Sequence, residues 1–124
     1  MSELKKENLE AFVEEFADGV EGQAKAVLTS DVQKGTECAH RYMAAVRSLQ
    51  RLGNEGRDAL ATLLNDRRSE VRVQAASYLL KYSGEQARLV LEREASGRGF
   101  TAFTALQVLK RWNEGTWNLD PLVD

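Results

Sequence analysis

The chain has 124 residues, of which 43% are hydrophobic and 29% charged, with a formal net charge of −2 at pH 7. This composition is too apolar for a disordered chain, and the length is that of about one domain. The only proline is Pro121, and β-branched runs are few, so we predict an all-α protein.

Apolar residues recur at helical spacing from the start of the chain. The first predicted helix covers about residues 3–17, with an apolar face opposite an acidic one, and Gly19 is expected to end it. A second, weaker helix is predicted over residues 21–32, and Gly35 is expected to break it.

Thr36 is the predicted N-cap of a third helix that reaches Leu52. A short helix is predicted over residues 58–64. Ser69 is expected to cap the next helix, which carries its apolar stripe as far as Tyr82.

Gly84 is expected to close that helix. Two further helices are predicted over residues 85–95 and 100–112. Gly115 is the expected C-terminal stop of the last helix, and residues 114–124 are predicted to form an irregular tail.

The helix that ends at Tyr82 and the helix that ends at Trp112 match each other when they are shifted by 30 residues. The matched pairs are Val73 and Phe103, Ala75 and Ala105, Ala76 and Leu106, Tyr78 and Val108, Leu79 and Leu109, Gln74 and Thr104, Ser77 and Gln107, and Lys81 and Arg111. A period of about 30 residues with two antiparallel helices per repeat predicts a short α-solenoid.

The string LATLLNDRRSEVRVQAASYLL resembles a HEAT-type repeat, in which Asp66 and Arg72 match the turn aspartate and the second-helix arginine. The order of GRDALATLL, EVRVQAASYLL and ALQVLKRWNEGTW is also similar, over about residues 20–119, to a bacterial family catalogued as domain of unknown function two-zero-one-nine. That resemblance implies HEAT-like helical domains with no defined catalytic residues, and some members resemble immunity proteins against secreted toxins.

We therefore predict a single domain, residues 1–124, that forms a HEAT-like superhelix of about six helices. It would comprise N-terminal helices over 1–33, helical repeats over 36–113 and the tail over 114–124. A lone helix pair cannot bury its apolar stripe, whereas stacked pairs remove both faces from water at roughly 25 cal/mol per Å².

Four residues are given structural roles. Asp66 and Arg72 are expected to tie a turn to the next helix, and a binding pair is the alternative. Trp117, together with Leu119, is expected to fold back over the open end of the stack near Trp112. The alternative is that Trp117 anchors a partner.

Cys38 and His40 could suggest a nucleophile and its base. On a helix they point roughly 200° apart, so we interpret Cys38 as a core residue and His40 as a surface residue. As the only cysteine, Cys38 also excludes an intrachain disulfide or a cysteine-based zinc site. No metal cluster or phosphate-binding loop is recognised, so we expect no enzyme, no cofactor and no metal.

The polar face of the second helices is the predicted partner-binding surface. Its residues are Arg47, Arg51, Gln74, Ser77, Lys81, Thr104, Gln107 and Arg111. Its bases would suit an acidic protein segment, and a solvated face without a partner is the alternative. Nucleic acid ranks lower, because the pI is about 5.5 and no aromatic residues interleave the bases.

The predicted function is non-enzymatic protein binding, including that of an immunity protein that occludes a toxin. The alternatives are a nucleic-acid-binding repeat, an enzyme or cofactor binder that uses a groove lined by this polar face, and a homo-oligomer formed through the open end of the stack. The first residues show no signal-peptide pattern, and no apolar run approaches the roughly 20 residues of a membrane span. We expect a cytoplasmic protein without a membrane segment.

Overall fold

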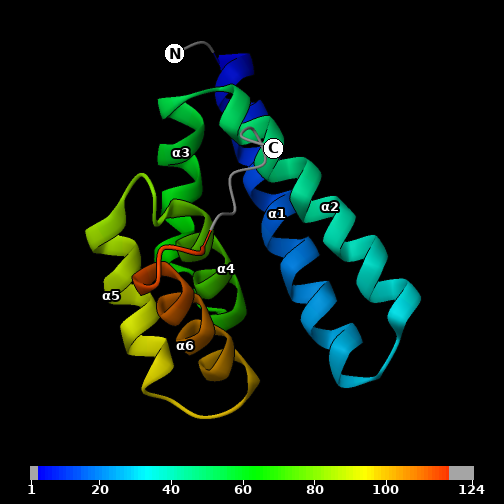
Figure 1. Ribbon diagram of the computed structural model, residues 1–124. Coiled ribbons are helices and arrows are strands. Elements are labelled where there is room, and N and C mark those ends of the chain that lie inside the picture. Colours follow the sequence, from blue (N-terminus) through cyan, green and yellow to red (C-terminus); the bar gives the residue numbers. More distant parts are fainter. Residues whose placement is uncertain (1–2, 118–124) are drawn as a thin grey trace. The chain divides into compact units, whose positions relative to one another are not determined.

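The computed structural model describes residues 3–117, in which six α-helices and one 3-10 helix form all of the regular secondary structure (Figure 1). The prediction of an all-α fold with about six helices is confirmed for this range. The chain divides into two compact units, Met1–Leu63 and Leu64–Asp124, and each packs three α-helices against one another. That the two units make one domain stays a prediction.

Unit 1 contains α1 (Glu3–Leu28), α2 (Val32–Arg51) and α3 (Asn54–Ala61). The first two form a long antiparallel hairpin, and α3 packs against both of them (Figure 1). In the core of the hairpin, the rings of Phe16 and Tyr42 meet edge to face with centroids 5.8 Å apart. Most of the helix packing within this unit is between α1 and α2.

Gly19 does not end the first helix, because α1 is a single helix of 26 residues. A Cβ atom on Gly19 would lie 2.9 Å from the carbonyl oxygen of Cys38, and one on Gly22 would lie 2.7 Å from the Cys38 Sγ. Both glycines thus let α2 approach the backbone of α1 closely. The prediction of a separate helix over residues 21–32 is also wrong, because residues 21–28 continue α1 without a break.

Thr36 is not the N-cap of the second helix. That position belongs to Asp31, whose Oδ1 accepts a hydrogen bond of 3.0 Å from the backbone N–H of Lys34. Thr36 lies inside α2 and donates its hydroxyl to the carbonyl of Val32 at 2.9 Å. The predicted break at Gly35 is therefore absent, and α2 runs across the expected division between residues 33 and 36.

Unit 2 contains α4 (Ser69–Leu79), α5 (Gly84–Ala95) and α6 (Phe100–Asn113), and each of the three packs against the other two. The 3-10 helix η1 (Thr62–Asn65) precedes them. The helix predicted over residues 58–64 is thus divided, since its first residues belong to α3 and its last three to η1. Gly115, at φ +75°, ends the last helix as predicted, in the left-handed conformation that favours glycine.

Ser69 and Gly84 do not have the roles that the sequence predicts for them. The N-cap of α4 is Arg68, which makes no capping hydrogen bond through its side chain, and Ser69 is the first helical residue. The helix ends at Leu79, before the predicted Tyr82. Gly84 is the first residue of α5, so it opens a helix and does not close one.

Two alanine substitutions in unit 1 test the close helix packing. A Cβ atom on Gly56 would overlap the backbone carbonyl of Leu49, so Gly56→Ala should lower the free energy of unfolding by about 3 kcal/mol. Gly35 is also helical, but its nearest neighbour would be the Cβ of Ala26 at 3.6 Å. Gly35→Ala should therefore raise that free energy by about 0.5–1 kcal/mol. Urea denaturation of the full chain measures both, and a neutral Gly56→Ala would contradict the close approach.

Candidate functional site

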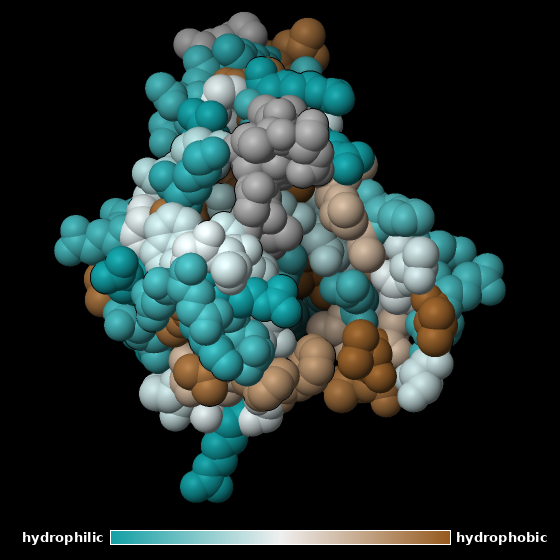
Figure 2. All heavy atoms as spheres, viewed as in Figure 1, coloured by the Kyte–Doolittle hydropathy of each residue, from teal (hydrophilic) through white to brown (hydrophobic). Residues whose placement is uncertain are grey.

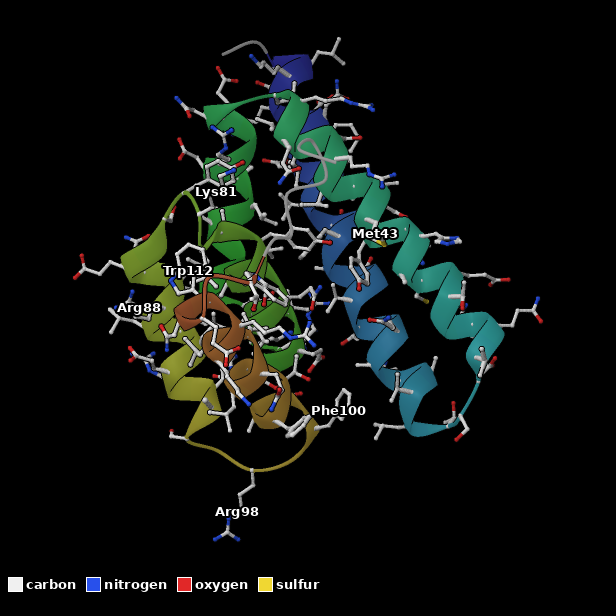
Figure 3. The ribbon with its side chains drawn as sticks, viewed as in Figure 1. Met43, Lys81, Arg88, Arg98, Phe100 and Trp112 are labelled. Carbon is white, nitrogen blue, oxygen red and sulfur yellow. The ribbon has the colours of Figure 1, made fainter. Side chains whose placement is uncertain are left out.

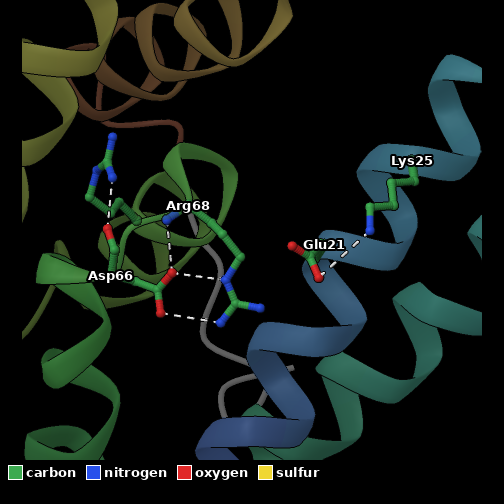
Figure 4. A network of polar contacts seen from close by, with 5 residues as sticks. Glu21, Lys25, Asp66 and Arg68 are labelled. Atoms are coloured by element: carbon green, nitrogen blue, oxygen red, sulfur yellow. Dashed lines mark hydrogen bonds and ion pairs between the residues drawn. The ribbon is translucent and has the colours of Figure 1, made fainter.

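The turn before α4 is organised by the carboxylate of Asp66. Its Oδ1 accepts hydrogen bonds from the backbone N–H and the Nε of Arg68, both at 2.9 Å, and its Oδ2 accepts one from Nη2 at 3.2 Å (Figure 4). The bond to the backbone two residues further on makes an Asx-turn. Because the Arg68 side chain donates to the ionised carboxylate, the pKa of Asp66 is lowered from its ordinary value.

Arg72 joins this turn to α5. Its Nη1 donates to the backbone carbonyl of Asp66 at 2.7 Å, and its Nη2 donates to Glu94 Oε2 at 2.9 Å. Arg72 thus binds the backbone of Asp66 and not its carboxylate, which is occupied by Arg68. One half-buried guanidinium connects the turn, α4 and α5, so these residues are engaged inside unit 2.

Trp117 folds back onto α4. Its indole Nε1 donates a hydrogen bond of 3.1 Å to the carbonyl oxygen of Ser77. Ser77 belongs to the last turn of α4, where the carbonyls have no partner within the helix, so the indole satisfies one of them. Trp112 is half-buried on α6, and Leu119 lies outside the described residues.

Most of the predicted partner-contacting residues reach solvent within their own unit. Arg47 and Arg51 are exposed on α2, Lys81 and Arg111 are exposed in unit 2, and Gln74, Thr104 and Gln107 are half-buried. The residues of α4 and α6 come from helices that pack against each other. A continuous basic groove that also includes α2 stays a prediction.

Ser77 does not belong to the exposed face on which the sequence placed it. Its side chain is buried, and its hydroxyl donates to the carbonyl of Val73 at 2.7 Å. Its own carbonyl accepts the Trp117 hydrogen bond. The serine therefore has its polar atoms engaged within the fold, a role that its polar character does not reveal.

An apolar stripe on α6 lies at the surface of the protein. Phe100, Phe103 and Leu106 are 67%, 58% and 52% exposed. Their spacing of three residues places them side by side along the helix. Figure 2 shows apolar side chains reaching the surface among polar ones, and Figure 3 shows Phe100 extending from the first turn of α6. The sequence contains one signal for this exposure. The helix α6 is the last of the repeated helices, so within the described residues no later repeat follows to cover its apolar face.

A hollow of about 580 Å³ lies at the turn between α1 and α2. Its lining includes Ala26, Gly35, Met43 and His40. The His40 side chain is exposed there, whereas Cys38 is only 2% exposed in the core. The predictions that Cys38 is a core residue and that His40 is a surface residue are confirmed.

Neither a metal-binding cluster nor a membrane-spanning helix is found in the part of the chain that the structure describes. Within residues 3–117, no group of three or more His, Cys, Asp or Glu residues is arranged to hold a metal ion. No helix in the same range is both long enough and apolar enough to cross a bilayer.

These features define an all-helical protein, and a solved structure has the same fold. The crystal structure of the protein RPA1889 from Rhodopseudomonas palustris CGA009 matches with a TM-score of 0.82 at 25% sequence identity, over 90% of this chain and 93% of that one. No family model and no curated protein matches the sequence. The HEAT-like and family resemblances stay predictions.

Asp66→Asn should destabilise the protein at neutral pH by about 1–2 kcal/mol, because it removes the charge that Arg68 binds. The lowered pKa means that this contribution is present above the unfolded-state pKa of about 4 and is lost as the pH falls through the folded-state value. Melting temperatures of the wild type and the variant should therefore converge in acid. Asp58→Asn, at an exposed aspartate, is the control, and a pH-independent difference for Asp66→Asn would contradict the assignment.

Trp117→Phe should lower the free energy of unfolding by about 1 kcal/mol, since phenylalanine keeps an aromatic ring but cannot donate to the Ser77 carbonyl. Urea titration followed by circular dichroism measures the change. Trp112→Phe serves as the matched substitution on α6. An unchanged unfolding midpoint for Trp117→Phe would show that the hydrogen bond does not stabilise the tail.

Proposed function

We propose that this chain is a non-enzymatic protein-binding module, built as a short HEAT-like solenoid, which binds its partner on the exposed side of α6. The observation that carries this proposal is the stripe of Phe100, Phe103 and Leu106, each more than half exposed. Large apolar side chains grouped on a surface mark interaction sites more often than single scattered ones do.

The repeat explains why this side of α6 is apolar. At a shift of 30 residues, Phe103 and Leu106 correspond to Val73 and Ala76 of α4, which are only 2% and 0% exposed. The two helices pack against each other in unit 2. In a solenoid, each repeat covers the equivalent face of the one before it, so this is the face of α6 that another molecule would cover.

The size of the stripe favours a small interface. An aromatic side chain buries about 150–250 Å² when fully covered, so these three residues together expose roughly 300 Å². A standard protein–protein interface buries about 800 Å² on each partner. The α6 stripe is therefore the apolar centre of a modest interface and is too small to hold an obligate dimer by itself. Occlusion of a toxin, which the family resemblance implies, would be one case of such binding.

Two matched leucine substitutions test the proposal. Leu106 on α6 and Leu89 on α5 are 52% and 55% exposed, so glutamine at either position should change the free energy of unfolding by less than about 0.5 kcal/mol. In affinity capture from cells of the source organism, Leu106→Gln should lose at least tenfold of a captured protein that Leu89→Gln retains. Equal retention by both variants, or no specific protein with the wild type, would refute binding on α6.

A further inference from the structure

The charged residues of α6 itself, and of the turn before it, are all basic, and Glu114 is the first acid after the helix. From Ser96 to Asn113 the chain contains Arg98, Lys110 and Arg111 and no aspartate or glutamate, a formal charge of +3. All three bases are exposed. This segment thus differs from the chain as a whole, whose net charge is −2.

The bases stand at the two ends of the apolar stripe. Lys110 follows Phe103 by seven residues, so it lies about two helical turns, or about 10 Å, further along nearly the same line of the helix. Arg111 is adjacent in the same turn. Arg98 precedes the helix, and Figure 3 shows its side chain extending away from the chain in the turn before Phe100.

We propose that the occupant of this surface is an acidic amphipathic helix of a partner protein. Its apolar side chains would cover the stripe, and its carboxylates would meet Lys110 and Arg111. This inference rests on the proposed function and specifies the chemistry of the partner. Helices bind in this way through apolar anchors spaced three or four residues apart, and an arginine fork binds a carboxylate through two hydrogen bonds.

Charge complementarity also disfavours the other occupants. A second copy that presented its own α6 would place bases against bases, since the segment contains no acid. Anionic membranes are bound by clusters of about 4–8 bases, and specific DNA-binding proteins neutralise about 6–10 phosphates. The α6 segment offers three bases, which suffice for a few carboxylates on a helix.

The proposal can be tested by selecting binding helices from a random library, so that no partner sequence is assumed in advance. A displayed library of 18-residue helices would carry leucine at every third or fourth position, with Glu, Lys, Gln or Ser at the flanking positions. Selection on the full-length wild type should enrich Glu over Lys at those positions at least tenfold. The double variant Lys110→Glu and Arg111→Glu should reverse this preference, because it replaces both bases at the C-terminal end of the stripe.

The controls separate charge on α6 from charge elsewhere. The double variant Lys34→Glu and Arg67→Glu changes the net charge by the same amount at exposed positions outside α6, and it should still select Glu. Phe103→Ser should abolish enrichment of any helix while leaving the circular dichroism spectrum unchanged. Binding to phosphatidylserine vesicles or duplex DNA that exceeds binding to the selected helices would overturn the proposal.

The outcomes also distinguish this inference from the function on which it rests. Enriched helices with neutral or basic flanks, lost on Phe103→Ser, would refute the acidic partner but leave protein binding on α6 intact. A complete lack of enrichment with wild-type protein would refute the helical partner. If Leu106→Gln retains its captured protein in cells, the failure lies with the proposed function itself.

Discussion

The close approach of helix backbones is the constraint on which the rest of this structure depends. In unit 1, any side chain at Gly19 or Gly56 would collide with backbone atoms of α2. In unit 2, Ala75 on α4 and Ala105 on α6 are fully buried and contribute only a methyl group each. Because the axes are set by these small residues, the larger side chains of the core have fixed positions to fill.

Apolar periodicity in the sequence predicts correctly that the chain is helical. The prediction fails at glycines, because a glycine can either end a helix or allow two helices to pack closely. The helical content, the last helix and its stop at Gly115 follow from apolar spacing and from the left-handed φ that glycine favours. Gly19 and Gly22 look the same in the sequence as Gly115, yet they lie within α1 and face Cys38. Only the presence of α2 on that side tells a packing glycine from a terminating one.

The surface was less predictable than the fold, because amphipathic spacing does not record whether a neighbour is present. Phe103 and Leu106 have the same apolar periodicity as Val73 and Ala76, but only the α4 pair is covered. Polar character misled in the opposite direction at Ser77, which is buried and bonded to its own helix. The charged residues on α2 and α6 were placed correctly on exposed faces, since long ionised side chains are rarely buried without a partner.

Cys38, the single cysteine of the chain, provides a natural chemical probe for local opening of the α1–α2 hairpin. The Sγ of Cys38 lies directly beneath Gly22, and only 2% of the residue is accessible. A thiol reagent can therefore reach the sulfur only after the hairpin opens locally or the chain unfolds. When the hairpin recloses faster than the reagent reacts, the labelling rate divided by the rate for a fully exposed thiol gives the equilibrium population of the open state. The opening of α1 and α2 can thus be followed without an introduced probe.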